Sequence, residues 1–61
     1  MPMIQITMLS GRTAEQKRKI AERVTAVMME EAGVKPEAVV VAFYEVAKES
    51  YARAGVLLSD R

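Results

Sequence analysis

The 61-residue sequence contains no cysteine, no histidine and no tryptophan. Without cysteine the chain has no disulfide and no catalytic thiolate, and without histidine it lacks the usual imidazole base and most zinc ligand sets. Its serines have no histidine to activate them as nucleophiles. The three glycines stand singly, so none belongs to a glycine-rich phosphate loop. These absences remove most of the common catalytic groups.

Neither sign of charge dominates, because the formal net charge is +1. A nucleic-acid-binding domain is usually clearly basic, so nucleic acid is not an expected partner. No apolar run approaches the roughly 20 residues that span a bilayer, and no signal peptide is recognisable. We therefore expect a cytoplasmic protein that acts without a membrane.

The small size of the chain predicts assembly. A domain of this length buries only about 60% of the surface that its unfolded chain exposes. Disulfides, metals or oligomerisation usually compensate, and this sequence leaves oligomerisation. Hydrophobic residues make up 51% of the chain, which is more than one small core needs. We expect one domain over residues 1–61 that forms a homo-oligomer.

The hydrophobic pattern changes period along the chain. Residues 3–9 alternate and predict a strand. A capping box begins at Thr13, and an apolar stripe with a period near 3.6 predicts a helix to about Ala32. The β-branched and aromatic run Val39–Val46 predicts a second strand, covered on both faces. A strand, a long helix and a strand predict a β-α-β unit with parallel strands and a right-handed crossover.

Two shorter segments complete the predicted fold. Residues 35–38 form a connector turn that Pro36 begins. Residues 48–58 read as a hairpin arm with an apolar end that docks on another subunit, and residues 59–61 as a solvated end. The fold class is therefore α/β: a single β-α-β subunit with parallel strands, a short connector turn and a C-terminal hairpin arm, assembled into an oligomer.

Pro2 follows Met1 and directly precedes the first predicted strand. Proline is about 5% of residues in general, so this start alone means little. Removal of Met1 would leave a secondary amine, and an N-terminal amine has a reference pKa of about 7.7–8.0, which burial and nearby cations lower. A neutral amine is a general base at pH 7 and can form an iminium with a carbonyl. We interpret Pro2 as the catalytic base, on the condition that Met1 is removed.

An acidic substrate needs a cationic partner. Arg12 follows the first strand and precedes the N-terminus of the helix, where the helix dipole also favours anions. Arg53 lies in the predicted docking arm. Surface arginines are more often simply solvated. A tyrosine such as Tyr51 more often packs against other side chains than contacts a flat, unsaturated substrate. These three are the candidate substrate-binding residues.

The residues Pro2, Leu9–Lys17, Tyr44–Lys48 and the region around Gly55 resemble the 4-oxalocrotonate tautomerase family, and the likeness covers essentially the whole chain. The resemblance implies β-α-β subunits that assemble as hexamers, trimers of dimers. It implies that the N-terminal proline is the general base that converts 2-hydroxymuconate or related dienols to the conjugated enone acid, without a cofactor, as in aromatic degradation. It also implies that Arg12 binds a substrate carboxylate and that Tyr51 lines the pocket.

One position departs from the family pattern. The family commonly has a second arginine early in the second strand, where it polarises the substrate's 2-keto or 2-hydroxyl group, and this chain has Val40 there. Losing such a donor typically costs about 10²–10³ in rate. We hypothesise that Arg53 of a neighbouring subunit supplies the missing charge.

Other functions stay open. A cofactor-free dehalogenase or hydratase acting on small unsaturated acids would need a carboxylate near Pro2. The chain could also be a non-catalytic protein, or a partner-dependent subunit of a hetero-oligomer whose partner holds the missing arginine. A ribbon-type DNA-binding dimer is disfavoured, because that fold needs a helix where residues 39–46 predict a strand.

Overall fold

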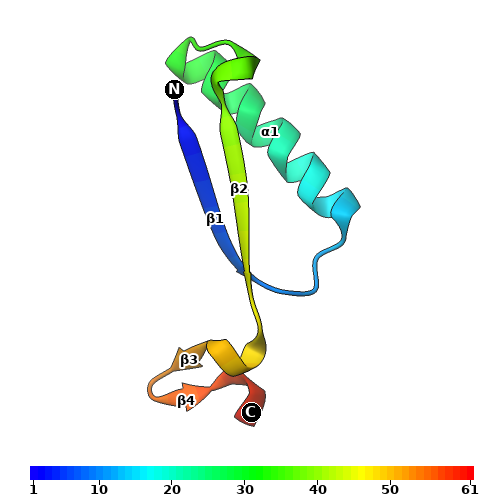
Figure 1. The fold of residues 1–61 in the computed structure, drawn as a ribbon, viewed down its shortest axis with the longest axis vertical. Coiled ribbons are helices and arrows are strands. Elements are labelled where there is room, and N and C mark those ends of the chain that lie inside the picture. Colours follow the sequence, from blue (N-terminus) through cyan, green and yellow to red (C-terminus); the bar gives the residue numbers. More distant parts are fainter.

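The structure is a computed structural model that describes residues Met1–Arg61 (Figure 1). Its first part consists of strand β1 (Met3–Leu9), helix α1 (Ala14–Ala32), a 3₁₀ turn (Pro36–Ala38) and strand β2 (Val40–Val46). The remainder consists of a 3₁₀ turn (Lys48–Ser50), short strands β3 (Ala52–Arg53) and β4 (Val56–Leu57), and a last 3₁₀ turn (Leu58–Asp60). The predicted β-α-β order, connector turn and hairpin arm are confirmed.

Strands β1 and β2 pair in parallel, with Met3 opposite Val40 and Leu9 opposite Val46. The even residues of β1 are half-buried on the side of α1. The opposite face of the sheet has no cover, because the chain has one long helix: Met3 is 60% exposed and Tyr44 49% exposed. The prediction that β2 is covered on both faces is therefore wrong for a single chain.

Local signals fix the ends of α1. The Thr13 hydroxyl accepts the Gln16 N–H at 3.1 Å, and the Gln16 side chain accepts the Thr13 N–H at 3.0 Å, so the capping box is complete. At the other end, Gly33 adopts φ +65° and its N–H donates to the Met29 carbonyl at 3.2 Å. Glycine suits this left-handed position because it has no Cβ.

The hairpin arm lies beyond the carboxyl ends of β1 and β2 (Figure 1). Ala54 and Gly55 both have positive φ, which suits the tight turn between two antiparallel strands. The Tyr51 carbonyl accepts the Leu58 N–H at 2.8 Å, and the Arg53 carbonyl accepts Nη2 of Arg61 at 3.2 Å. The end of the chain is thus a hydrogen-bonded turn, where the sequence predicted only a solvated end.

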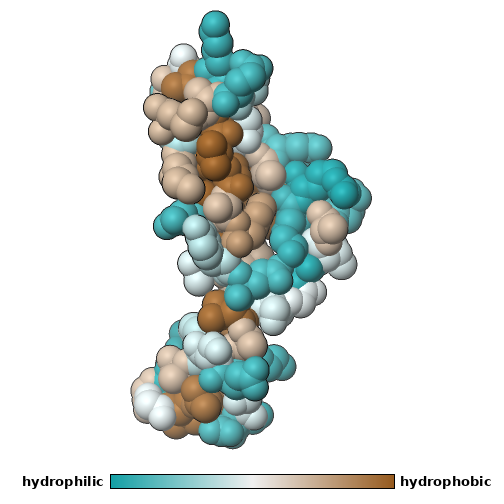
Figure 2. Space-filling view, in the orientation of Figure 1, coloured by the Kyte–Doolittle hydropathy of each residue, from teal (hydrophilic) through white to brown (hydrophobic).

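The chain has no closed core, and not one of the 61 residues is fully buried. Its accessible surface is 4779 Å², whereas a compact monomer of 6.8 kDa is expected to expose about 4,000 Å². Its radius of gyration is 14.7 Å, against about 10.5 Å for a compact domain of this length. Brown, apolar surface gathers over the strands and the arm in Figure 2, while the first half of α1 is hydrophilic. No helix has the length and apolar composition that would cross a bilayer.

Candidate functional site

Pro2 lies immediately before β1 and is held against the start of β2. Its carbonyl accepts the Val40 N–H at 3.1 Å, and the residue is half-buried. Met1, which precedes it, is 91% exposed. The backbone hydrogen bond therefore fixes the position of Pro2. The Pro2 nitrogen takes no part in that bond and is joined to the exposed Met1.

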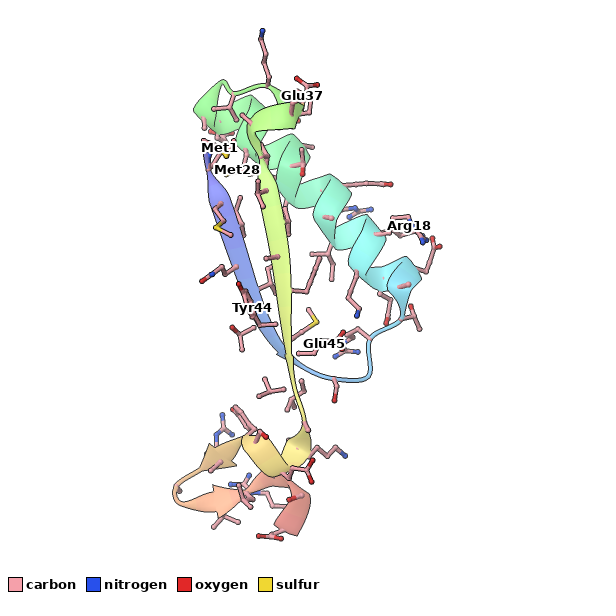
Figure 3. All side chains as sticks on the ribbon, viewed as in Figure 1. Met1, Arg18, Met28, Glu37, Tyr44 and Glu45 are labelled. Atoms are coloured by element: carbon pink, nitrogen blue, oxygen red, sulfur yellow. The ribbon has the colours of Figure 1, made fainter.

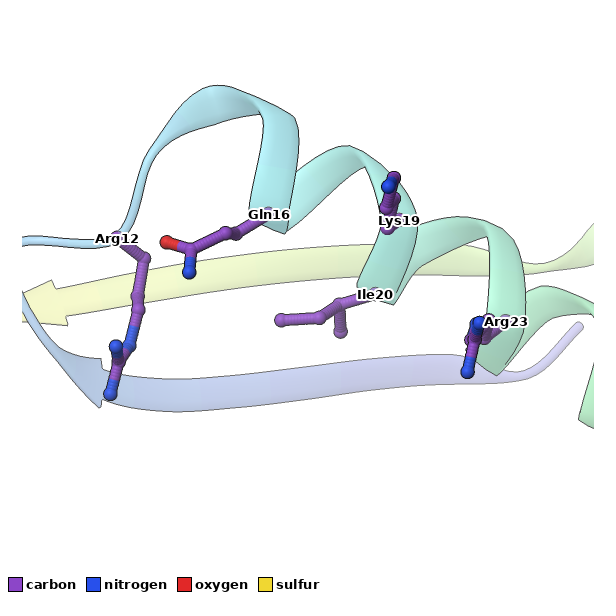
Figure 4. A pocket seen from close by; sticks show the side chains of 5 residues that line it. All are labelled: Arg12, Gln16, Lys19, Ile20 and Arg23. Carbon is purple, nitrogen blue, oxygen red and sulfur yellow. The ribbon is translucent and has the colours of Figure 1, made fainter.

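Arg12 lies in the loop between β1 and α1, directly after Gly11, whose φ is +123°. It borders a cavity of about 360 Å³ that Figure 4 shows between the start of α1 and β1; the lining residues are Arg12, Gln16, Lys19, Ile20 and Arg23. The three cations in this lining form no ion pair within the chain. Because the Gln16 oxygen is engaged in the capping box, the lining offers donors and suits an anion.

Tyr51 and Arg53 belong to the hairpin arm. Tyr51 is 40% exposed and borders a hollow of about 240 Å³ at the carboxyl ends of the strands, lined also by Thr7, Met8, Leu9 and Val46. Arg53 is exposed on β3, and its guanidinium forms no ion pair in the chain. Tyr51 thus borders a mainly apolar hollow, and Arg53 offers a free cation.

The structure does not bring all four predicted site residues together in one chain. Arg12, Tyr51 and Arg53 follow the carboxyl ends of β1 and β2, whereas Pro2 precedes the opposite end of β1. The seven residues of β1 extend over roughly 20 Å at about 3.3 Å per residue. A site that contains both Pro2 and Arg12 therefore needs more than one copy of the chain.

The sequence does not predict an ion pair that the structure shows near the Arg12 loop. Lys17 lies near the start of α1, and its ammonium group pairs with the Glu45 carboxylate of β2. The one indication of this pair in the sequence is Glu45, because it is the single acidic residue in strands β1 and β2. A charged residue in an apolar strand usually has a partner.

The fold defines a class of small β-α-β proteins that end in a hairpin arm. The family model described as "Tautomerase enzyme" matches residues 2–61. The chain therefore belongs to the tautomerase family, as its sequence resemblance implied, and is an isomerase.

Similar proteins cover the full chain. The chain is 47% identical over 60 residues to a 2-hydroxymuconate tautomerase of Bacillus subtilis (strain 168), with 98% of this chain and 97% of the relative covered. It is 46% identical over 61 residues to a probable tautomerase of Bacillus cereus, with both chains fully covered.

Solved structures agree with this assignment. A crystal structure of a 4-oxalocrotonate tautomerase homologue superposes with a TM-score of 0.96 at 38% identity, covering 100% of this chain and 97% of that one. A heterohexamer 4-oxalocrotonate tautomerase from Chloroflexus aurantiacus superposes with a TM-score of 0.89 at 28% identity, covering 98% and 97%.

Proposed function

We propose that this tautomerase interconverts the enol and keto forms of 2-hydroxy-dienoates such as 2-hydroxymuconate, or of related 2-oxo acids. The observation that carries the proposal is the near full-length similarity to a 2-hydroxymuconate tautomerase. The donor-lined cavity at Arg12 supports an acidic substrate.

The general base of the proposed reaction is the Pro2 amine, after removal of Met1. The neutral amine accepts the proton of the 2-hydroxyl group, and the resulting ammonium returns a proton to carbon as the dienol becomes the conjugated ketone. The Val40–Pro2 hydrogen bond supports this role, because it holds the ring in place at the start of β1 without using the nitrogen.

Arg12 binds a carboxylate of the substrate in this proposal. Its guanidinium is free of internal partners and can form two parallel hydrogen bonds to a carboxylate. Tyr51 lines the pocket next to the flat substrate, and Arg53 supplies the positive charge that Val40 does not.

The proposed site lies between copies of the chain. Strand β1 pairs with β2 along one edge only, so its other edge is free to pair with a second copy. Antiparallel pairing of two β1 strands would bring Pro2 of one copy next to Arg12 of the other. Further copies that cover the exposed sheet face would produce the hexamer, a trimer of dimers, that the family resemblance implies.

Replacement of Pro2 tests the proposed base. The enzyme is purified, its intact mass establishes whether Met1 is gone, and the loss of 2-hydroxymuconate absorbance is followed in the same sample. Pro2→Ala replaces the ring amine with a primary amine that no ring orients, and it is expected to lower kcat by up to about 10² to 10⁴, the usual contribution of a positioned general base. Pro36→Ala is the matched control, since it makes the same substitution in the connector turn. Full activity in Pro2→Ala, or in protein that keeps Met1, would contradict the proposal.

A partner-dependent enzyme is the second candidate. Val40 stands where the family resemblance places an arginine, and a structurally similar tautomerase is a heterohexamer. Native mass spectrometry and a tautomerase assay of the same purified chain distinguish a homo-oligomeric enzyme from a partner-dependent one. An active assembly of identical subunits contradicts the hetero-oligomer, whereas an inactive assembly of identical subunits favours it.

A further inference from the structure

The Lys17–Glu45 ion pair joins two segments that are 28 residues apart in the sequence. Lys17 lies near the start of α1, and Glu45 lies near the carboxyl end of β2, on the side opposite Tyr44 (Figure 3). The two side chains are 29% and 33% exposed. The other ion pair, Arg18–Glu15, stays within the first turns of α1 and is 61% and 65% exposed.

Two interactions with the end of β2 hold the chain on either side of the Arg12 loop, and the ion pair is one of them. On the strand side of the loop, the Ser10 N–H donates to the Val46 carbonyl at 2.9 Å. On the helix side, Lys17 pairs with Glu45, the residue directly before Val46. The end of β2 thus holds the chain both before and after Arg12. Between these anchors residues 11–13 are exposed, and Gly11 adopts φ +123°.

We propose that Lys17 and Glu45 are positioning residues that hold Arg12 where it binds the substrate carboxylate. This inference rests on the proposed role of Arg12. Lys17 acts in two ways: it anchors the start of α1 to β2, and it neutralises the one carboxylate of the two main strands. Without Lys17, the unpaired Glu45 carboxylate would compete with the substrate carboxylate for the Arg12 guanidinium.

Steady-state kinetics with 2-hydroxymuconate test the proposal. Lys17→Met is expected to raise KM about three- to fivefold, as fits a partly exposed ion pair, with kcat nearly unchanged. Glu45→Gln is expected to have a smaller effect, because it leaves no competing carboxylate. The paired change Lys17→Glu with Glu45→Lys restores the ion pair and is expected to return KM toward the wild-type value. Arg18→Met is the control and leaves KM unchanged.

A double-mutant cycle then asks whether Lys17 acts through Arg12. Arg12→Ala is expected to raise KM. Adding Lys17→Met to it is expected to raise KM no further, because Lys17 and Glu45 then have no Arg12 guanidinium to position. Native mass and melting temperature are recorded for each variant. A variant that only loses folded protein shows a lower apparent kcat with an unchanged KM.

The possible failures are distinguishable. A normal KM in Arg12→Ala overturns the carboxylate-binding role of Arg12, and the positioning role with it. A raised KM in Arg12→Ala together with a normal KM in Lys17→Met overturns the positioning role alone. The same holds if Lys17→Met lowers kcat without changing KM, or if the effects of Arg12→Ala and Lys17→Met simply add.

Discussion

Val40 lies next to the proposed base, at the position where the family resemblance places an arginine. Its N–H donates to the Pro2 carbonyl at 3.1 Å, so its side chain starts next to the proposed base. Val40 is 38% exposed and lies opposite Met3 on the sheet face that α1 does not cover. Within one chain the position therefore has room for a longer side chain. Valine itself offers no hydrogen-bond donor to charge that develops on the substrate oxygen.

In an Arg53→Ala background, Val40→Arg is expected to raise kcat/KM for 2-hydroxymuconate by about 10² to 10³, the usual value of one donor to a developing oxyanion. Steady-state kinetics check this, with Val40→Leu as the control for size. In the wild type, Arg53→Ala is expected to lower activity, whereas in Val40→Arg it has little effect because the charge is already supplied. Unchanged wild-type kinetics in Arg53→Ala would exclude Arg53 as the substitute, and no gain in Val40→Arg would show that charge at this position is not limiting.

The N-terminus of helix α1 directly follows Arg12, a residue of the proposed site. Its capping box begins one residue after Arg12, so the same hydrogen bonds that start the helix also end the loop. Both side-chain bonds, at 3.0 and 3.1 Å, lie within residues 13–16. Loss of the cap therefore affects stability directly and the Arg12 loop through it.

Thr13→Ala is expected to lower the free energy of unfolding by about 1 kcal/mol per subunit, the typical cost of removing an N-cap side chain. Thr25→Ala is the matched control: it makes the same substitution inside α1, where alanine is a better helix former and no cap is lost. Denaturant unfolding at one fixed protein concentration measures both. Equal effects at Thr13 and Thr25 would show that the cap contributes nothing beyond helix propensity.

The elements could be predicted from the sequence because their signals are local. Alternation over residues 3–9 and the capping box at Thr13 each depend on neighbours a few residues away, and both match the structure. The Lys17–Glu45 pair could not be predicted in this way, since periodicity assigns Lys17 to a helix face without identifying a partner 28 residues later. The same limit applies to the site: Pro2 and Arg12 are ten positions apart in the sequence, but β1 separates them in space.

The molecule as a whole is elongated and thin. Its principal extents are 44, 23 and 13 Å, and the arm accounts for much of the length (Figure 1). Apolar side chains on the uncovered sheet face and on the arm remain in contact with solvent; they include Met3, Val40, Tyr44, Val56 and Leu57. Isolated monomers rarely leave large apolar patches exposed, so this surface favours contact with further copies.

Tyr44→Lys is expected to separate the proposed hexamer into smaller species. Tyr44 is 49% exposed on the uncovered face, where its hydroxyl accepts the Gln5 amide at 3.3 Å, and a lysine buried there would lack a counter-charge. Ala26→Lys is the control, because Ala26 is exposed on α1, the layer that covers the other face of the sheet. Light scattering and native mass spectrometry give the mass of each variant.

Two further readouts separate loss of assembly from a local change at Tyr44. The melting temperature of Tyr44→Lys should rise with protein concentration, since association stabilises the folded state by mass action. Activity should fall together with the assembled fraction, because Pro2 and Arg12 meet only between copies in the proposed site. A Tyr44→Lys variant that keeps the wild-type mass would contradict assembly through this face. A fully active monomer would contradict a site shared between subunits, since one chain holds the two residues at opposite ends of β1.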